Sequence, residues 1–244
     1  MKYFFDSELS IPYSLNYPLL SYLYECLSSV DEDLASWLHG EGISYQNRKY
    51  KPLTFSGLRF SNKQKRHRYQ IVKGTATLMI SSMNEALCMK LIEGMWKKQG
   101  LLLLDAFLPL IEVKILPEPE YQENMRYRSL SPIVVPVQDS NKKTHFCHPL
   151  ESRFFESIKV SLKNWYYIKW GEHFPENIRI DLSVLHPERF QLKKSAVLTE
   201  VKKKKIKAYE LDLEVHAPIK LQQVIYEQSL GSYGIQGFGM MEII

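Results

Sequence analysis

Near the end of the sequence stands a glycine-rich stretch, Gly231-Ser232-Tyr233-Gly234-Ile235-Gln236-Gly237-Phe238-Gly239, and the mostly apolar residues 240–244 follow it directly. Four glycines in this short stretch permit positive φ angles and a close approach of the backbone. The stretch is not a Walker loop, because it contains no Gly-Lys-Ser/Thr, and it does not follow a first strand as a dinucleotide-binding fingerprint does. It is either a flexible connection between the last helix and the last strand or a loop whose amides face phosphate groups.

Outward from this loop, apolar periodicity predicts two halves with the same order of elements. In the first half we expect residues 1–9 (strand), 17–38 (helix, which the acidic residues 31–33 can divide), 53–60 and 69–80 (a strand pair around a basic turn), 84–97 (helix) and 101–116 (strand). In the second half we expect residues 126–137 (strand), 149–167 (helix), 178–185 and 205–215 (strands), 218–228 (helix) and 237–244 (strand). Each half therefore has the order β-α-β-β-α-β.

This order predicts an α+β protein made of two tandem ferredoxin-like (RRM-like, βαββαβ) domains. Pro117 and Pro119 interrupt the chain between the halves, so we place residues 1–118 in one domain and residues 119–244 in the other. The same sheet topology occurs in RNA-recognition modules. A fold by itself does not determine a function, so the function has to be argued from particular residues.

The charged residues are compatible with a nucleic-acid partner. The chain carries 32 basic and 27 acidic side chains, and its net charge of +5 permits such a partner without requiring it. The basic residues gather in three clusters, namely Arg48, Lys49 and Lys51; Lys63, Lys65, Arg66 and Arg68; and Lys202 to Lys205. One such run is usually a solvated surface, whereas several runs in one small protein favour contact with phosphates.

The cysteines and histidines give no clear metal site. Cys26, Cys88 and Cys147 are far apart and include no CxxC pair, so a reducing, cytoplasmic compartment fits best. The segment His145-Phe146-Cys147-His148 has the residue types of a metal site, but no matching ligands stand near it in the sequence. We therefore interpret it as a turn and expect no metal or cofactor. The chain shows no signal-peptide pattern and no apolar run of roughly 18 residues, so we expect no membrane partner.

Three motifs, in this order along the chain, resemble one protein family. They are Lys51-Pro52-Leu53-Thr54-Phe55-Ser56-Gly57-Leu58, Ser129-Leu130-Ser131-Pro132-Ile133-Val134-Val135, and the glycine-rich stretch with its final Gly237-Phe238-Gly239. The set resembles the CRISPR-associated RAMP proteins, and in particular the endoribonuclease Cas6, which cuts CRISPR precursor RNA within its repeats. Many members carry a basic residue inside the loop, which this chain lacks, so the resemblance implies phosphate contact through backbone amides.

The resemblance also implies a catalytic set, and Tyr24, His39 and Lys51 match its positions. Such an enzyme uses the 2′-hydroxyl of the RNA as nucleophile, needs no metal, and leaves 2′,3′-cyclic phosphate and 5′-hydroxyl ends. We expect His39 to act as general acid–base, because an imidazole titrates near neutral pH. Tyr24 would position the 2′-hydroxyl or act as the base, and Lys51 would stabilise the transition state. Without the resemblance, His39 would be interpreted as a helix-ending residue and Tyr24 as a core aromatic.

The predicted RNA-binding residues are basic side chains and glycines of the loop, namely Arg48, Lys49, Arg66, Arg68, Lys202, Lys203, Lys204, Gly231, Gly234, Gly237 and Gly239. The implied partner is the CRISPR repeat in precursor RNA, other CRISPR effector subunits are further candidate partners, and the chain is expected to be a monomer or a weak homodimer. Two other functions stay open. One is a non-cleaving RAMP subunit that holds processed RNA in an effector complex. The other is a ferredoxin-like enzyme acting on a small metabolite, which would show no salt-dependent binding of RNA.

Overall fold

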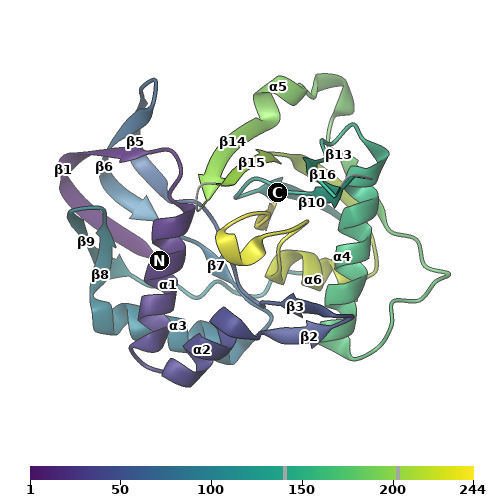
Figure 1. Cartoon of the computed structure of the whole chain (residues 1–244), viewed down its shortest axis with the longest axis horizontal. Coiled ribbons are helices and arrows are strands. Elements are labelled where there is room, and N and C mark those ends of the chain that lie inside the picture. Colours follow the sequence, from purple (N-terminus) through teal and green to yellow (C-terminus); the bar gives the residue numbers. More distant parts are fainter. Residues whose placement is uncertain (140–141, 202–203) are drawn as a thin grey trace.

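The computed structural model describes residues 1–139, 142–201 and 204–244, and it contains two helix-bearing sheets side by side (Figure 1). The first module is an antiparallel sheet with the strand order β5-β6-β1-β9-β8. Its strands are β1 (Lys2–Pro12), β5 (Arg59–Lys65), β6 (Tyr69–Thr77), β8 (Gly100–Leu103) and β9 (Ala106–Glu112). Its helices are α1 (Asn16–Ser28), α2 (Glu32–Gly40) and α3 (Glu85–Lys98). Two short strand pairs complete it, namely β2 (Ile43–Tyr45) with β3 (Arg48–Tyr50) and β4 (Thr54–Phe55) with β7 (Ile80–Ser81).

The core of the first module lies between its sheet and its helices. Alternate residues of β1 share a face of the sheet, and Tyr3 and Phe5 are buried on it with the apolar side chains of α1 and α3. Gly94 lets α3 pack directly on α1, because a Cβ at this position would lie 2.0 Å from the carbonyl oxygen of Cys26. The close helix pair supports α1, which carries one of the predicted catalytic residues.

The second module is an antiparallel sheet with the strand order β13-β16-β10-β17. Its strands are β10 (Asn124–Ser129), β13 (Asp181–Val184), β16 (Asp212–His216) and β17 (Met241–Ile243). Helices α4 (Ser152–Trp170) and α6 (Ile219–Glu227) pack on it and share its apolar core. The smaller elements are β11 (Pro136–Gln138), β12 (Thr144–Phe146), η1 (Pro187–Arg189), α5 (Leu192–Ser195), β14 (Ala196–Val201), β15 (Lys204–Tyr209) and η2 (Gly234–Gln236).

The order of strands confirms the predicted fold class. Numbered along the chain, the four main strands of each sheet lie in the order 2-3-1-4, and β8 adds a further edge strand to the first sheet. This is the antiparallel arrangement of a βαββαβ unit, in which the two crossing helices lie on one face. The protein is therefore an α+β chain of two ferredoxin-like modules.

Each of three segments predicted to be a single strand forms two separate strands in the structure. Residues 101–116 form β8 and β9, because Leu104 adopts a positive φ of 55° and turns the chain. Residues 205–215 divide into β15 and β16, and residues 126–137 divide into β10 and β11. Beyond β10 the chain leaves the sheet and lies beside β15 and the glycine-rich stretch. There Ile133 pairs with Tyr209, and Val134 pairs with Gly231. The second predicted motif thus connects the sheet of the second module to the glycine-rich stretch.

Other boundaries also differ from the prediction. The helix expected over residues 17–38 divides into α1 and α2, as the acidic residues 31–33 indicate, because the carboxylate of Asp31 accepts the amide of Leu34 at 2.9 Å and caps α2. The strand expected over residues 53–60 is found only in part, as β4, which pairs with β7; the strand that carries the basic turn to β6 is β5, which begins at Arg59. The pair β2–β3 is not predicted by the sequence, and its turn uses positive φ values at Gln46 and Asn47.

The two modules interlock through the β2–β3 hairpin. Tyr50 of β3 is buried in the core of the second module, where its hydroxyl oxygen accepts the side-chain amide of Asn164 from α4 at 2.8 Å. Tyr45 stacks on Tyr167 of α4, with ring centroids 4.4 Å apart. The domain boundary at residues 118/119 stays a prediction. Within the described ranges, no helix combines the length and apolarity that crossing a membrane requires.

Candidate active site

A cavity of about 610 Å³ opens where the two modules meet. Its lining includes Tyr24 of α1, His39 of α2 and Lys51, which follows β3. The opposite side is formed by Ile235 and Gln236 of the η2 turn, within the glycine-rich stretch. The structure therefore brings the three predicted catalytic residues together, and it adds two residues from the far end of the sequence.

Tyr24 and His39 form an edge-to-face pair in this cavity. Their ring centroids lie 5.3 Å apart with planes inclined by 71°. Tyr24 is half-buried and its hydroxyl donates to the carbonyl oxygen of Leu38 at 3.4 Å, whereas His39 is exposed at the end of α2. Burial raises the pKa of Tyr24 to about 12. A phenol with this pKa stays protonated at neutral pH, so its side chain can donate a hydrogen bond and is a poor base.

Two lysines meet the C-terminal end of α2. The ammonium of Lys51 donates to the carbonyl oxygen of His39, and that of Lys49 donates to the carbonyl oxygen of Gly40 at 2.9 Å. Cations are favoured there because the last carbonyl groups of a helix carry partial negative charge. Lys51 thus places a positive charge within the cavity and next to His39. Arg48 lies exposed on the same hairpin as Lys49.

The glycines of the loop allow it to pack closely against neighbouring segments. At Gly239 a Cβ would lie 2.1 Å from the carbonyl oxygen of Leu230, and at Gly237 it would lie 2.5 Å from the ring of Phe55. Both have positive φ angles, and so does Gly231, whose added Cβ would lie 2.5 Å from the carbonyl oxygen of Val134. The loop therefore packs against the Lys51–Leu58 motif of the first module. This contact places the η2 turn at the cavity.

Asn16 does not line the cavity but supports its wall, and sequence reasoning missed this residue. Its side-chain amide donates to the carbonyl oxygens of Gln236 at 2.7 Å and Gly237 at 3.1 Å, so the start of α1 holds the glycine-rich stretch. Neither this contact nor the place of Ile235 in the cavity leaves a signal in the sequence, because both depend on how the modules are oriented. The glycine motif itself was the only available clue to that segment.

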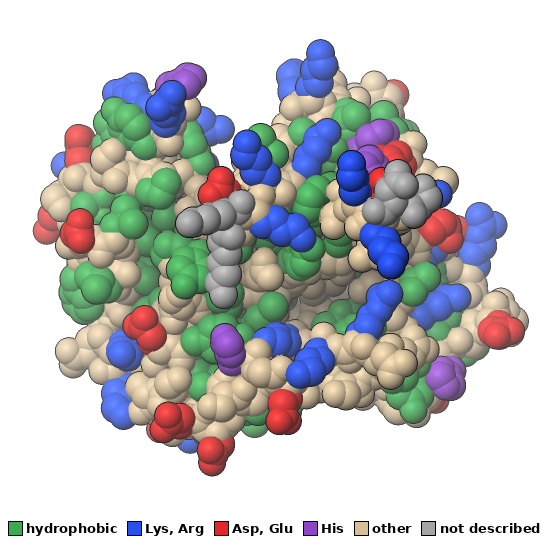
Figure 2. Space-filling view, viewed as in Figure 1, with side chains coloured by type: hydrophobic (Ala, Val, Ile, Leu, Met, Phe, Trp, Pro, Cys, Tyr) green, Lys and Arg blue, Asp and Glu red, His purple; other side chains and the backbone are tan. Residues whose placement is uncertain are grey.

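The remaining predicted RNA-binding residues that the structure describes lie on the β5–β6 hairpin and on β15. Arg66 and Arg68 are exposed at the tip of the β5–β6 hairpin. Lys204 begins β15, and its ammonium donates to the hydroxyl oxygen of Tyr233 in the glycine-rich stretch at 3.3 Å. The predicted Lys202 and Lys203 lie outside the described residues. Figure 2 shows Lys and Arg side chains on both sides of the hollow between the modules.

Comparison with known proteins identifies the family. Residues 10–114 match the family model described as CRISPR-associated protein Cas6, N-terminal, and residues 116–243 match the model described as CRISPR associated protein Cas6, C-terminal. The chain is 24% identical over 242 residues to the CRISPR-associated endoribonuclease Cas6 of Pyrococcus furiosus, with 98% of this chain and 85% of that protein covered. It is 26% identical over 240 residues to the CRISPR-associated endoribonuclease Cas6 1 of Methanocaldococcus jannaschii, with 97% and 88% covered.

The fold agrees with this comparison. A solved structure described as CRISPR associated protein Cas6 has a TM-score of 0.80 at 25% identity, and the alignment covers 100% of this chain and 97% of that chain. The C-terminal family model alone spans more than half of the 244 residues, and the N-terminal model spans most of the rest. This chain therefore belongs to the Cas6 family of CRISPR-associated proteins.

Proposed function

We propose that the protein is a metal-independent endoribonuclease that binds CRISPR precursor RNA and cuts it within the repeat. The observation that carries the proposal is the convergence of Tyr24, His39 and Lys51 in one cavity, with the glycine-rich stretch of the second module at its edge. Family membership supports the choice of substrate, because the relatives from Pyrococcus furiosus and Methanocaldococcus jannaschii are both named CRISPR-associated endoribonucleases.

The composition of the cavity favours a reaction without metal. Among the described residues that line it, Glu25 is the one carboxylate and His39 is the one imidazole. Mg²⁺ at such sites is usually held by one or two carboxylates together with substrate phosphates, and a pair of ions would need more carboxylates than the single Glu25 supplies. The 2′-hydroxyl beside the scissile phosphate is an internal nucleophile, so the protein has only to orient it, move protons and stabilise charge.

In the proposed reaction, the 2′-oxygen forms a bond to phosphorus while the bond from phosphorus to the 5′-oxygen breaks. One proton leaves the 2′-hydroxyl and one proton reaches the 5′-oxygen, and His39 is the group in the cavity suited to such transfers. The protonated Tyr24 gives up its long hydrogen bond to the carbonyl oxygen of Leu38 and donates to the RNA instead, which positions the reacting group. The ammonium of Lys51 stabilises the charge on the phosphorane-like transition state. The products are a 2′,3′-cyclic phosphate and a 5′-hydroxyl.

Phosphate contacts would hold the RNA across the junction of the modules. Arg48, Arg66, Arg68 and Lys204 are exposed cations on the two modules, so we expect the affinity for RNA to fall steeply with salt. Two of the predicted glycines do not offer their amides to RNA. The amide of Gly237 donates to the carbonyl oxygen of Gly234, and the amide of Gly239 donates to that of Pro132. We propose that a phosphate oxygen instead meets the amides of Gly234 and Ile235 at the beginning of the η2 turn.

The test uses a repeat RNA incubated with the protein in EDTA. We expect cleavage by the wild-type chain, a 2′,3′-cyclic phosphate on the 5′ product, and a loss of rate of about 10²- to 10⁴-fold in His39→Ala without loss of binding. His216→Ala is the matched control, because this exposed histidine on β16 does not line the cavity. Cleavage that requires a metal would refute the mechanism. Intact, salt-dependent binding with no cleavage would instead support the non-cleaving RAMP subunit.

A further inference from the structure

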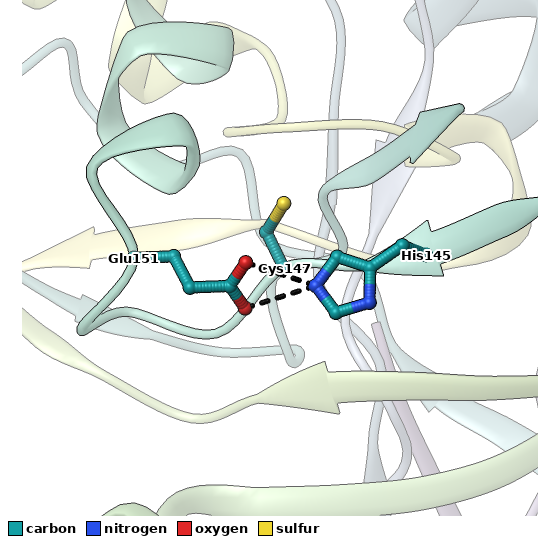
Figure 3. Close-up of side chains that lie close together, drawn as sticks. All are labelled: His145, Cys147 and Glu151. Carbon is teal, nitrogen blue, oxygen red and sulfur yellow. Dashed lines mark hydrogen bonds and ion pairs between the residues drawn. The ribbon is translucent and has the colours of Figure 1, made fainter. Parts of the chain in front are cut away.

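A second group of reactive side chains lies in the second module, outside the cavity. His145, Cys147 and Glu151 meet where the β11–β12 hairpin is followed by α4 (Figure 3). Nε2 of His145 lies 3.0 Å and 2.9 Å from the two carboxylate oxygens of Glu151, and a nitrogen, the sulfur and a carboxylate oxygen of the three residues all lie within 4.8 Å of one another. None of the three residues lines the candidate active site.

The backbone holds two of these side chains on one side of an extended segment. His145 pairs with Val137 in the β11–β12 hairpin, and the amide of Cys147 continues this pairing by donating to the carbonyl oxygen of Val135 at 2.9 Å. Residues two positions apart in an extended chain point to the same side. The imidazole and the thiol are therefore placed together by the hairpin itself.

Glu151 completes the group from the other direction. It stands at the N-cap of α4, where a carboxylate commonly accepts amides of its own helix. Its side chain makes no such capping bond and instead turns back, accepting the amide of His148 at 2.8 Å and facing His145. The sequence pattern did not single out Glu151, so our interpretation of residues 145–148 as a turn without further ligands is wrong on this point.

The ring of His148 lies beside this carboxylate. Its Nδ1 accepts the amide of Leu150 at 3.2 Å, which places the proton of a neutral ring on Nε2. That nitrogen lies 3.4 Å from Oε1 of Glu151. His148 thus lies beside the carboxylate, and its backbone amide, which donates to Oε1 of Glu151 at 2.8 Å, orients that side chain as outer groups orient metal-binding side chains.

We propose that His145, Cys147 and Glu151 bind one zinc-like transition-metal dication, with a fourth position open to water. Zn²⁺ takes imidazole nitrogen, thiolate sulfur and carboxylate oxygen at about 2.0 to 2.3 Å, and one thiolate with one carboxylate balances its charge. Nitrogen and sulfur ligands disfavour Mg²⁺ and Ca²⁺. Binding breaks the His145–Glu151 contact, releases the thiol proton of Cys147 to solvent, and ties the β11–β12 hairpin to the start of α4.

The site is accessible although its sulfur is buried. The side chains of His145 and Glu151 are 52% and 26% exposed, so an ion can reach them from solvent, while Cys147 lies at the inner end of the group. An ion here would act on the structure of the hairpin. It would not take part in cleavage at His39, which lies in a different cavity.

The test titrates the full chain, first treated with chelator and dialysed, with Co²⁺ and then with Zn²⁺. We expect one Co²⁺ per chain with thiolate-to-metal charge-transfer absorption, and loss of that absorption after one equivalent of Zn²⁺. Cys147→Ser should abolish the charge-transfer band, whereas Cys88→Ser, the matched control outside the group, should keep it. His145→Gln changes an exposed side chain and should lose tight Zn²⁺ binding in calorimetry. His148→Ala keeps the backbone amide that holds Glu151, so this variant should still bind one Zn²⁺.

Three results would overturn the proposal: no Zn²⁺ binding by the folded wild-type chain, an unchanged Co²⁺ spectrum in Cys147→Ser, or equal Zn²⁺ affinity of His145→Gln and the wild type. Far-ultraviolet circular dichroism of each variant separates loss of the site from loss of the fold. These readouts involve no RNA, so their failure leaves the proposed cleavage reaction standing.

Discussion

Replacing Tyr24 by phenylalanine separates a hydrogen-bond donor from a general base in the candidate active site. Burial raises the pKa of Tyr24 to about 12. At about pH 8 only roughly one Tyr24 side chain in 10,000 is then a phenolate. If the phenolate were the base, nearly all enzyme molecules would be inactive at that pH. We therefore expect the phenol to act through one donated hydrogen bond. A bond to a charged group contributes about 1.5–3 kcal/mol, and its loss would slow cleavage roughly 10- to 150-fold.

The assay is single-turnover cleavage of repeat RNA between about pH 6 and about pH 10. We expect the profile of Tyr24→Phe to run parallel to that of the wild type, lowered by the same factor throughout. Tyr69→Phe, at an exposed tyrosine outside the cavity, should cleave at the wild-type rate. The reasoning is refuted if the wild-type rate rises about tenfold per pH unit above about pH 8 and Tyr24→Phe abolishes that rise, because the phenolate would then be the base.

Three further predictions concern stability, each measured from the midpoint of denaturation. Gly94→Ala should destabilise the fold by about 1–3 kcal/mol, because the new methyl group must displace the carbonyl oxygen of Cys26; an unchanged midpoint would contradict the close helix contact. Asn164→Ala should cost about 1–3 kcal/mol by leaving the buried hydroxyl of Tyr50 unpaired, and adding Tyr50→Phe should restore part of it; strictly additive losses would argue against the bond. Burial holds the pKa of Tyr127 above its usual range, so the unfolded chain releases this proton at lower pH than the folded chain. Its contribution is complete below about pH 10 and is lost as the pH rises, and Tyr127→Phe should flatten that loss in an alkaline titration.

The sequence predicts an element correctly where the spacing of apolar residues agrees with the capping and turn residues at its ends. Residues 84–97 have apolar spacing and a capping Asn84, whose side chain accepts the amide of Leu87, and α3 is found there. Residues 101–116 are apolar with no strong turn signal, so the positive φ at Leu104 could not be anticipated and one strand was expected in place of two. The β2–β3 hairpin was missed for a related reason, since its turn lacks glycine and two of its residues gain stability from α4.

The candidate site was predictable only in part. Tyr24, His39 and Lys51 follow from the resemblance, and their meeting in one cavity depends on local chain geometry around α1 and α2. The contribution of Ile235 could not be predicted, because it requires the packing of the glycine-rich stretch on Phe55 across the junction of the modules. Pairings between distant segments are set by the tertiary arrangement, which local patterns do not encode.

The junction at Tyr50 also bears on how the protein is made. Translation delivers α1, α2 and Lys51 first, but Tyr50 finds its partner Asn164 only after α4 has been synthesised. The η2 turn that closes the cavity emerges later still. Domains in general begin to fold as they leave the ribosome. A nascent chain that stalls before the second module is complete would contain His39 and Lys51 but lack the η2 turn that lines the cavity. We therefore expect such a truncated product to be unable to cut RNA.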